Sequence, residues 1–554
     1  MEYTYYPMHM HIHAGCDYGS SMALNMYNAS LLDMKHIWFT DHDTRMGLRK
    51  YRITGFSFDE SLVKNEDIGH HGFKLIDEKT DCSVDTSAKI LKINSLPGEG
   101  DSWVNSGVYF YSTGTRHTCS LAADVKLALD IKHFKPCENS RLILAVKLSQ
   151  RPPDMKNAYV LYVLGSTEGL EGEHIQVISA DIKNGTLVMP VSNDVSDSME
   201  IGGRDNAFDT MYIVLQTRNG ASSYAEIGDF NIYREKNCEE LRKELQKVAD
   251  RVGEHYGVKP FVSFEVSAAG EHKNCYSTRV PVIEYHNHDY NVSETEAIEH
   301  IKKHNGIFAL NHPFAGSQFK RMGDCTEPVR EEKLNNLFGE ISDADALGAT
   351  LMEVGFPEGR IFPFEYYLRL WDMLSLKGIF LTGYGSSDCH RNNEGWFDGN
   401  NFVAYVGADA ALPCPRKAEI FIDAMKKGRL YTGDPVKLKG EVSFQTTDGA
   451  HMGSVLCGKE SVGICFSAKN VKPGWEFRIV ESGRAMHTQK ITSENFDYIG
   501  SLELKGKDLE FCRAELWDET GRCIMLTNPI YLVSSFFLEE HKCDERIRIR
   551  IAKI

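Results

Sequence analysis

Short apolar runs alternate with helix-type spacing in two separate parts of the chain. Short strands are predicted at 8–13, 37–39, 261–264, 307–310, 350–354 and 379–382. Helix-type spacing of apolar positions covers 20–34, 238–256, 293–301, 364–376 and 418–427. Such alternation of strands with amphipathic helices is typical of α/β folds.

The pattern differs in the intervening segment and at the C-terminal end. Between 74 and 233 no helix period is found, and alternating runs such as 125–131 and 142–148 predict a β-sandwich. Because strand–helix alternation returns at 238, this sandwich is predicted to be an insertion into the first domain. After 436, strand-type runs such as 462–466 and 511–517 predict a second, smaller sandwich.

We therefore expect three domains. The first is discontinuous, comprising 1–50 and 236–435; residues 51–235 form the inserted, jelly-roll-like sandwich, and 436–554 form the C-terminal one. Aromatic residues of the insertion suit either stacking on a sugar or ordinary packing in the core. They are Trp103, Tyr109, Tyr111 and Tyr224.

Composition narrows the classes of partner. The 62 basic and 78 acidic residues give a formal charge of −16, which argues against nucleic acid as the main partner. A small-molecule substrate, such as a sugar or nucleotide derivative, fits better. No run of about 18 apolar residues and no signal-peptide pattern is present, so we expect no membrane contact and a cytoplasmic protein. The 14 cysteines form no Cys-x-x-Cys pair, which suits a reducing compartment. The oligomeric state stays open.

Metal-ligand side chains follow the predicted strands. In His11-x-His13, two imidazoles share one face of a strand, because side chains alternate along it. Four more clusters come later, each after an apolar strand: Asp41-His42, Glu265 with His272, Asn311-His312-Pro313, and Asp388-x-His390. Active sites of α/β folds gather at the carboxyl ends of strands. Nitrogen and oxygen ligands without thiolate suit Zn, Mn or Fe.

This ordered series resembles the motifs of the PHP (polymerase and histidinol phosphatase) superfamily. Within it, the insertion, the spacing from Glu265 to His272 and the ending Leu526-Thr527-Asn528-Pro529-Ile530-Tyr531 are most similar to the carbaryl-hydrolase-like (CehA/McbA) branch. The resemblance implies an α/β fold built on a distorted (β/α)7 barrel, decorated by the two sandwiches. It also implies two or three divalent metal ions at the strand ends.

The same resemblance implies a set of ligands for each metal. His11, His13, Glu265 and Asp388 would hold the first ion. Glu265, His272 and His312 would hold a second. His42 and His390 would hold a third, with Asp17 as the further candidate of this site.

The expected activity is that of a metal-dependent hydrolase of phosphoesterase type. Adjacent cations lower the pKa of a bound water, giving a hydroxide near neutral pH for attack on a small anionic phosphoester. His42 or His390 could instead protonate the leaving group if the third site is empty, with Asp41 orienting His42. Two alternatives stay open: a carboxyl-ester or carbamate hydrolase of the CehA/McbA type, and a carbohydrate-binding protein with a non-catalytic barrel.

Two arginines are candidates for binding an anionic substrate. Arg45 follows the Asp41-His42 cluster, and Arg391 directly follows His390. Guanidinium groups bind phosphate through bidentate hydrogen bonds. Each arginine could equally be a surface residue paired with an acid such as Asp43 or Glu394.

Overall fold

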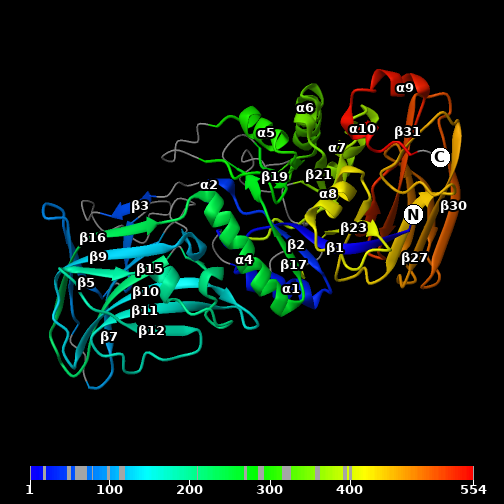
Figure 1. The fold of residues 1–554 in the computed structure, drawn as a ribbon. Coiled ribbons are helices and arrows are strands. Elements are labelled where there is room, and N and C mark those ends of the chain that lie inside the picture. The colour runs from blue at the N-terminus through cyan, green and yellow to red at the C-terminus, as the bar shows by residue number, and fades with distance from the viewer. Residues whose placement is uncertain are drawn as a thin grey trace.

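The protein was analysed as a computed structural model of the 554-residue chain. The described residues are 2–16, 20–46, 51–56, 72–77, 79–96, 100–111, 119–208, 210–267, 271–284, 292–314, 326–355, 362–390, 396–397 and 402–552. The structure is mostly β-sheet, with 41% strand and 22% helix. Three regions follow one another across the molecule, with the α/β region between two regions built of strands (Figure 1).

The central region contains strands from both segments, 1–50 and 236–435, of the predicted discontinuous domain. Its strands are β1 (Tyr3–Ile12), β2 (His36–Phe39), β17 (Lys259–Val262), β18 (Phe264–Val266), β19 (Lys273–Tyr276), β20 (Ile307–Leu310), β21 (Leu351–Gly355), β22 (Thr382–Gly385), β23 (Val403–Asp409) and β24 (Leu430–Gly433). Its helices are α1 (Met22–Leu31), α2 (Asp43–Met46), α4 (Cys238–Tyr256), α5 (Glu294–Lys303), α6 (Glu327–Asp343), α7 (Phe364–Leu376) and α8 (Ala418–Lys426).

The predicted (β/α)7 barrel is wrong. In the described residues these strands belong to two separate mixed sheets, ordered β17-β2-β1-β23-β24 and β18-β19-β20-β21-β22, and no closed barrel forms. The chain leaves the first sheet at Ser263, between β17 and β18, and β19 and β23 run antiparallel to their neighbours. Single parallel bridges, Ile12 with Cys389 and His42 with Glu265, connect the two sheets where the predicted ligands lie.

The region at 51–235 consists of two main sheets that share one apolar core. One sheet has the order β12-β11-β10-β15-β7-β4, with strands Ile175–Ser179, Lys156–Leu164, Ser140–Arg151, Thr210–Thr217, Val104–Tyr111 and Gly72–Leu75. The other has the order β13-β9-β16-β6-β5, with strands Thr186–Met189, Val125–His133, Tyr224–Arg234, Ile90–Asn94 and Asp81–Asp85; β3 (Tyr51–Phe56) pairs with β16. Short elements complete it: β8 (Cys119–Ser120), β14 (Ala207–Phe208) and α3 (Val191–Asp194).

The C-terminal region continues the central sheet. β24 pairs antiparallel with β32 (Cys523–Thr527), so hydrogen bonding crosses the predicted boundary at 435. The other strands of that sheet are β31 (Leu509–Trp517), β28 (Glu476–Glu481), β29 (Arg484–Lys490), β26 (Val455–Cys457) and β33 (Ile530–Val533). A smaller sheet of β25 (Glu441–Thr446), β27 (Ser461–Lys469) and β30 (Phe496–Glu503) and helices α9 (Ser535–Glu540) and α10 (Glu545–Arg548) complete it.

Capping interactions define both ends of helix α4. Asn237 caps it by accepting from Glu240 N–H, and the Glu240 side chain accepts in return from Asn237 N–H, a reciprocal capping box. Gly257, at φ 69°, ends it in the left-handed conformation that glycine adopts without steric cost. Its buried stripe, which includes Leu241 and Leu245, packs in the same core as the β-layers of the insertion.

In the described residues, none of the helices combines the length and the apolar character needed to cross a membrane.

Candidate metal centre

The row of histidines at the end of β1 delivers two imidazoles to the cluster. His11 and His13 are fully buried, and their Nε2 atoms lie 3.2 Å apart. His9 shares their face but makes a different contact, because its Nε2 lies 2.8 Å from Ser387 Oγ. Burial and the neighbouring His11 lower the pKa of His9 to about 3, so it stays neutral.

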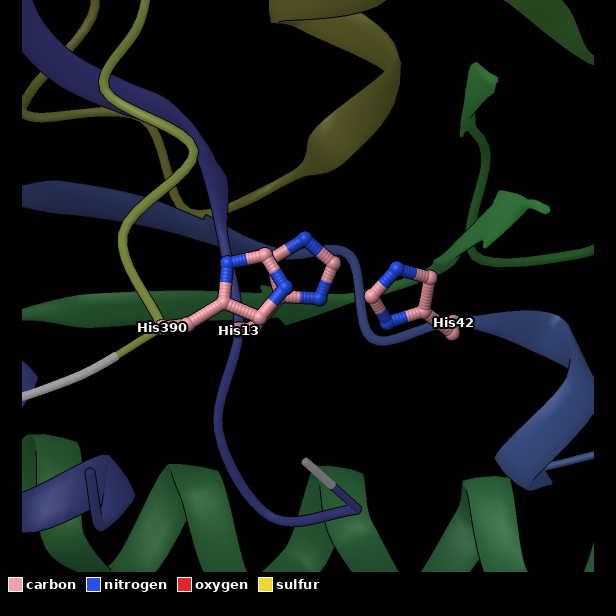
Figure 2. Close-up of side chains that lie close together, drawn as sticks. All are labelled: His13, His42 and His390. Carbon is pink, nitrogen blue, oxygen red and sulfur yellow. The ribbon is translucent and has the colours of Figure 1, made fainter. Parts of the chain in front are cut away.

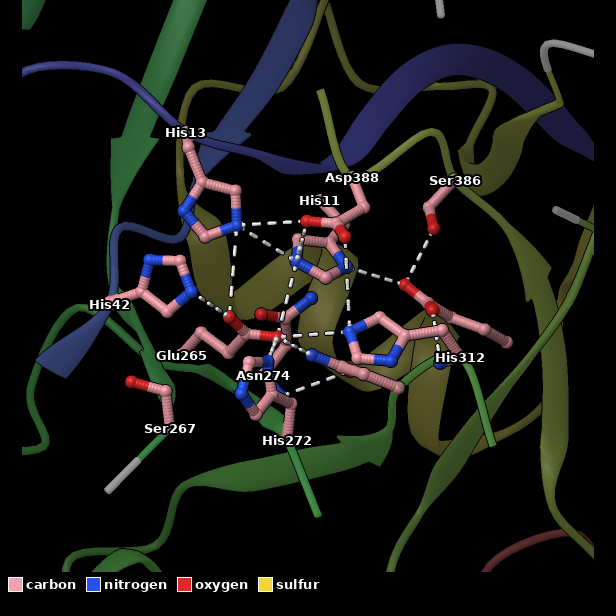
Figure 3. A network of polar contacts seen from close by, with 12 residues as sticks. His11, His13, His42, Glu265, Ser267, His272, Asn274, His312, Ser386 and Asp388 are labelled. Atoms are coloured by element: carbon pink, nitrogen blue, oxygen red, sulfur yellow. Dashed lines mark hydrogen bonds and ion pairs between the residues drawn. The ribbon is translucent and has the colours of Figure 1, made fainter. Parts of the chain in front are cut away.

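Glu265, on β18, lies at the centre of the predicted ligands and is fully buried. Its two carboxylate oxygens face different imidazoles (Figure 3). Oε1 lies 3.4 Å from His11 Nε2, 3.2 Å from His272 Nδ1 and 3.6 Å from His312 Nε2, whereas Oε2 lies 3.3 Å from His42 Nε2 and 3.7 Å from His13 Nε2. A carboxylate placed in this way can bridge two cations.

Asp388 completes the centre from the segment after β22. Its Oδ1 lies 3.2 Å from His11 Nε2, 3.1 Å from His13 Nε2 and 3.5 Å from His390 Nδ1, and Oδ2 lies 3.9 Å from His312 Nε2. Asp388 and His312 have φ values of 52° and 23°, which residues with a Cβ rarely adopt. Strained backbone of this kind concentrates at functional sites.

At this centre, three groups of side chains have ligand atoms within 4.8 Å of one another: His11 with His13 and Asp388; His42 with Glu265 and His272; and His13 with His42 and His390. A fourth such group among the described residues, Asp154 with Glu173 and His174, lies in the inserted region. Figure 2 shows the third group, in which the His13 ring stacks on His390 and on His42 at centroid distances of 3.9 and 4.4 Å, and the rings of His42 and His390 lie 5.3 Å apart. His312 belongs to none of these groups but contacts Glu265 and Asp388, so the cluster contains all the predicted ligands that the structure describes. His13 accompanies the pair predicted for the third metal, and His42 lies in the group of Glu265 and His272.

The donor chemistry fits divalent metal ions. Glu265 Oε2 and Asp388 Oδ1 are buried atoms without a hydrogen bond of acceptable geometry. Leaving a buried carboxylate oxygen unsatisfied is costly unless a cation binds it. These buried His, Asp and Glu groups could hold a metal ion.

Charge in the centre is balanced between carboxylates and imidazoles. Burial opposes ionisation of Glu265 and Asp388, but the nearby His11 holds the pKa of both carboxyls well below its usual range. Burial disfavours a charged His11, yet Glu353, Asp388 and Glu265 raise its pKa well above the ordinary value. The same carboxylates raise the pKa of His312 against its burial. The centre is thus built to hold positive charge.

Glu353 was missed as a functional residue by the sequence analysis. This fully buried carboxylate on β21 lies 2.6 Å from His11 Nδ1 and accepts from Tyr384 OH at 3.1 Å, Ser386 Oγ at 2.5 Å and His312 N at 2.5 Å. It therefore holds the proton of His11 on Nδ1 and leaves Nε2 free for a ligand. The signal in the sequence was a carboxylate inside an otherwise apolar strand.

Asn311 also has a role that its motif did not reveal. Its Nδ2 donates to Glu265 Oε1 at 2.6 Å, and its Oδ1 accepts from Asn274 N at 3.1 Å. Its own backbone N–H donates to His272 O at 3.2 Å. Asn311 therefore fixes the orientation of the bridging carboxylate relative to β19.

Asp41 supports the segment that follows His13. Its carboxylate accepts from Ala14 N at 2.6 Å and from Cys16 N at 3.1 Å, across the turn at Gly15. Its predicted action on His42 stays a prediction. Asp17 and Arg391 lie outside the described residues; Arg45 lies in α2, with its side chain outside the described part.

Comparison with known proteins gives no family. No protein-family profile matches the chain, and no curated protein matches it. The CARDB domain of a Pyrococcus furiosus protein, solved with two metal ions, is 13% identical over 17% of this chain and 92% of that chain, with a TM-score of 0.14. A cellulase derived from that of Rhodothermus marinus is 8% identical over 27% and 83%, with a TM-score of 0.18. A family 12 xyloglucanase from Bacillus licheniformis is 6% identical over 31% and 90%, with a TM-score of 0.20. Structural similarity this low supports no conclusion about the fold or the function of this chain.

Proposed function

We propose that this protein is a metal-dependent hydrolase that cleaves a small phosphoester, using two or three divalent ions bound by the cluster around Glu265. The observation that carries the proposal is the position of Glu265. Its two carboxylate oxygens face five imidazoles, and the Oε2 atom has no hydrogen bond. The motifs that resemble the PHP superfamily support the same activity.

The chain would contribute an ordered set of ligands. Zn, Mn or Fe bound here would supply a Lewis acid that activates water and stabilises charge on the ester oxygens. Glu353 and Asn311 keep His11 and Glu265 in one orientation before any substrate arrives. Positioning of this kind reduces the reorganisation needed during the reaction.

His390 is suited to deliver a proton to the leaving group. Its Nδ1 donates to the backbone carbonyl of Asp388 at 2.9 Å, which fixes that nitrogen as the protonated one. A second proton on the ring therefore has to sit on Nε2. The side chain is 31% exposed, whereas that of His13 is fully buried, so His390 lies on the accessible side of the cluster.

A carboxyl-ester or carbamate hydrolase is the second candidate. It is favoured by three acidic side chains, those of Glu271, Glu294 and Glu340, which line a pocket beside His272 and disfavour additional negative charge there. Lys273, in the same pocket, is already paired with Glu294.

The test combines metal analysis with a substrate screen. Purified protein reconstituted with Zn, Mn or Fe should contain at least two ions per chain by elemental analysis. It should hydrolyse p-nitrophenyl phosphate or bis(p-nitrophenyl) phosphate faster than p-nitrophenyl acetate or an N-methylcarbamate, and Asp388→Asn should remove most of the activity. Less than one ion per chain would refute a metal-dependent reaction, and a preference for the neutral esters would select the second candidate.

A further inference from the structure

A pocket of about 190 Å³ lies directly beside the metal centre, between α6 and the end of β20. Its walls are mostly apolar and include Leu310, Pro313, Leu337, Ile341 and Leu347. Residues of α6 and of the turn that follows this helix form most of its apolar lining. These apolar side chains cannot bind a metal ion, so the metal centre does not explain the pocket.

The pocket and the centre share two residues. His272 and Asn311 line the pocket, and both contact Glu265 Oε1, at 3.2 Å through Nδ1 and at 2.6 Å through Nδ2. The His272 side chain is 35% exposed, more than any other imidazole that contacts Glu265. The pocket therefore adjoins the cluster at His272, the most exposed of these imidazoles.

An unusual turn forms one wall. Asp345, Ala346 and Leu347 all have φ near 50°, followed by Gly348 at 76°, although left-handed backbone is sterically disfavoured for residues with a Cβ. Arg546 holds the turn by an ion pair with Asp345, and Lys302 Nζ donates to Leu347 O at 2.7 Å. Such strain persists where the surroundings enforce it, and here it directs Ala346 and Leu347 to the pocket.

The size and charge of the pocket define its occupant. An apolar cavity of about 150 Å³ accepts benzene, so this pocket fits one aromatic ring or a branched alkyl group of similar size. Glu271 and Glu340, with Glu294 paired to Lys273, leave the lining net acidic, which disfavours a phosphate, a carboxylate or a nucleotide.

We propose that this pocket is the subsite for a compact, uncharged apolar group on the substrate, so that the hydrolase acts on esters of small aromatic or branched aliphatic alcohols. The substrate class rests on the proposed function, whereas binding of the apolar group does not. The pocket then supplies affinity through burial of apolar surface, and the cluster holds the ester group.

The first experiment measures the pocket alone. Saturation-transfer NMR with benzyl alcohol, on full-length protein without added metal, should give a clear signal for wild type. Ile341→Trp, which fills the pocket from the half-buried side of α6, should abolish this signal. Ala344→Phe, at an exposed residue of the same lining, should weaken it at least about threefold and cannot disturb the core.

The matched control is Leu376→Trp, because Leu376 is a 49% exposed residue of α7 that does not line this pocket. It should keep the wild-type signal. No signal for wild type, or equal signals for wild type and both filled variants, would overturn the pocket proposal.

The second experiment separates the pocket from the function. Calorimetric titration of metal-loaded protein should show benzylphosphonate binding at least about tenfold more tightly than methylphosphonate. Ile341→Trp should reduce the advantage to less than about twofold while leaving the Kd of methylphosphonate unchanged. Equal affinity of the two phosphonates for wild type would refute the subsite. Binding of benzyl alcohol without binding of either phosphonate would refute the phosphoesterase instead.

Discussion

Two buried carboxylates, Asp205 in the inserted region and Glu265 in the centre, have contrasting surroundings. Asp205 pairs with Arg151 and accepts from Met22 N at 2.8 Å and Ala23 N at 3.3 Å, at the start of α1. None of its oxygens is among the buried atoms without a hydrogen bond, whereas Glu265 Oε2 is one of them.

The difference separates a structural carboxylate from one that could hold a metal ion. The donors around Asp205 come from the backbone and an arginine, so they stay charged or polar at every pH of interest. The groups around Glu265 are mainly imidazoles, which can give up their protons to bind a cation. Burial alone does not tell the two roles apart; the chemistry of the partners does.

Glu265→Gln should give the largest effect, a loss of kcat/KM of at least about a thousandfold, or about 4 kcal/mol. Removing the charge leaves the histidines without the carboxylate that bridges them, so metal content should fall below one ion per chain by elemental analysis. The free energy of unfolding of the metal-free protein should fall, because the charged His11 loses one of its carboxylate partners.

A suitable control for this variant is Glu299→Gln, because Glu299 is an exposed residue of α5. Activity and metal content should be those of wild type. A Glu265→Gln protein that keeps two ions and full activity would show that Glu265 is not needed to hold the metal ions.

Asp205→Asn should lower stability without changing metal binding. Removing one partner leaves the Arg151 guanidinium buried and uncompensated, so the free energy of unfolding should fall by about 3 kcal/mol in urea titrations. Metal content at a temperature where the variant is folded should be unchanged. The double variant with Arg151→Met should recover part of the loss; stability equal to wild type in Asp205→Asn alone would contradict a structural role.

Glu353→Gln should have an intermediate effect on metal binding. An amide in place of this carboxylate can present its NH₂ to His11 Nδ1 and so disturbs the tautomer that exposes Nε2. We expect metal affinity to fall about 10- to 100-fold in competition titrations with a chelator, with kcat recovering at saturating metal. If the metal affinity does not change, Glu353 serves packing only.

The smallest effect concerns His36 on β2, a buried histidine away from the cluster. Its Nε2 donates to Pro415 O at 2.7 Å, and burial lowers the pKa to about 4. Below the unfolded pKa of about 6.5 the histidine of the unfolded chain binds a proton, whereas the buried histidine stays neutral until the pH nears 4. The folded state is therefore favoured fully above about pH 6.5 and loses stability as the pH falls towards 4. Wild type should therefore lose about 1 kcal/mol more than His36→Gln between pH 7.5 and 5.5.

The measurement compares urea midpoints of wild type and His36→Gln across this range, with the same metal concentration in every sample. Parallel curves for the two proteins would show that His36 does not titrate in this way.

Sequence patterns were informative wherever the chemistry is local. The helix predicted at 238–256 is present as α4 with its capping residues, and the spacing of His11 and His13 places both rings on one side of β1. The predicted metal-binding side chains that the structure describes lie together, and Asp17 lies outside the described residues. The barrel implied by the resemblance was wrong, because neither the motifs nor the strand–helix alternation reveals which strands pair or in which direction. The strands divide between two sheets, and β19 and β23 run antiparallel to their neighbours.

By itself, the sequence determined which residues could act as ligands and in which order they follow the strands, because these depend on side-chain chemistry and on the alternation of neighbours along a strand. Only the tertiary structure decided that Glu265 lies between the histidines, that Glu353 holds His11, and that a strained turn forms the wall of a pocket beside His272. These contacts join residues tens to hundreds of positions apart, and such proximity arises from packing, which no local pattern encodes.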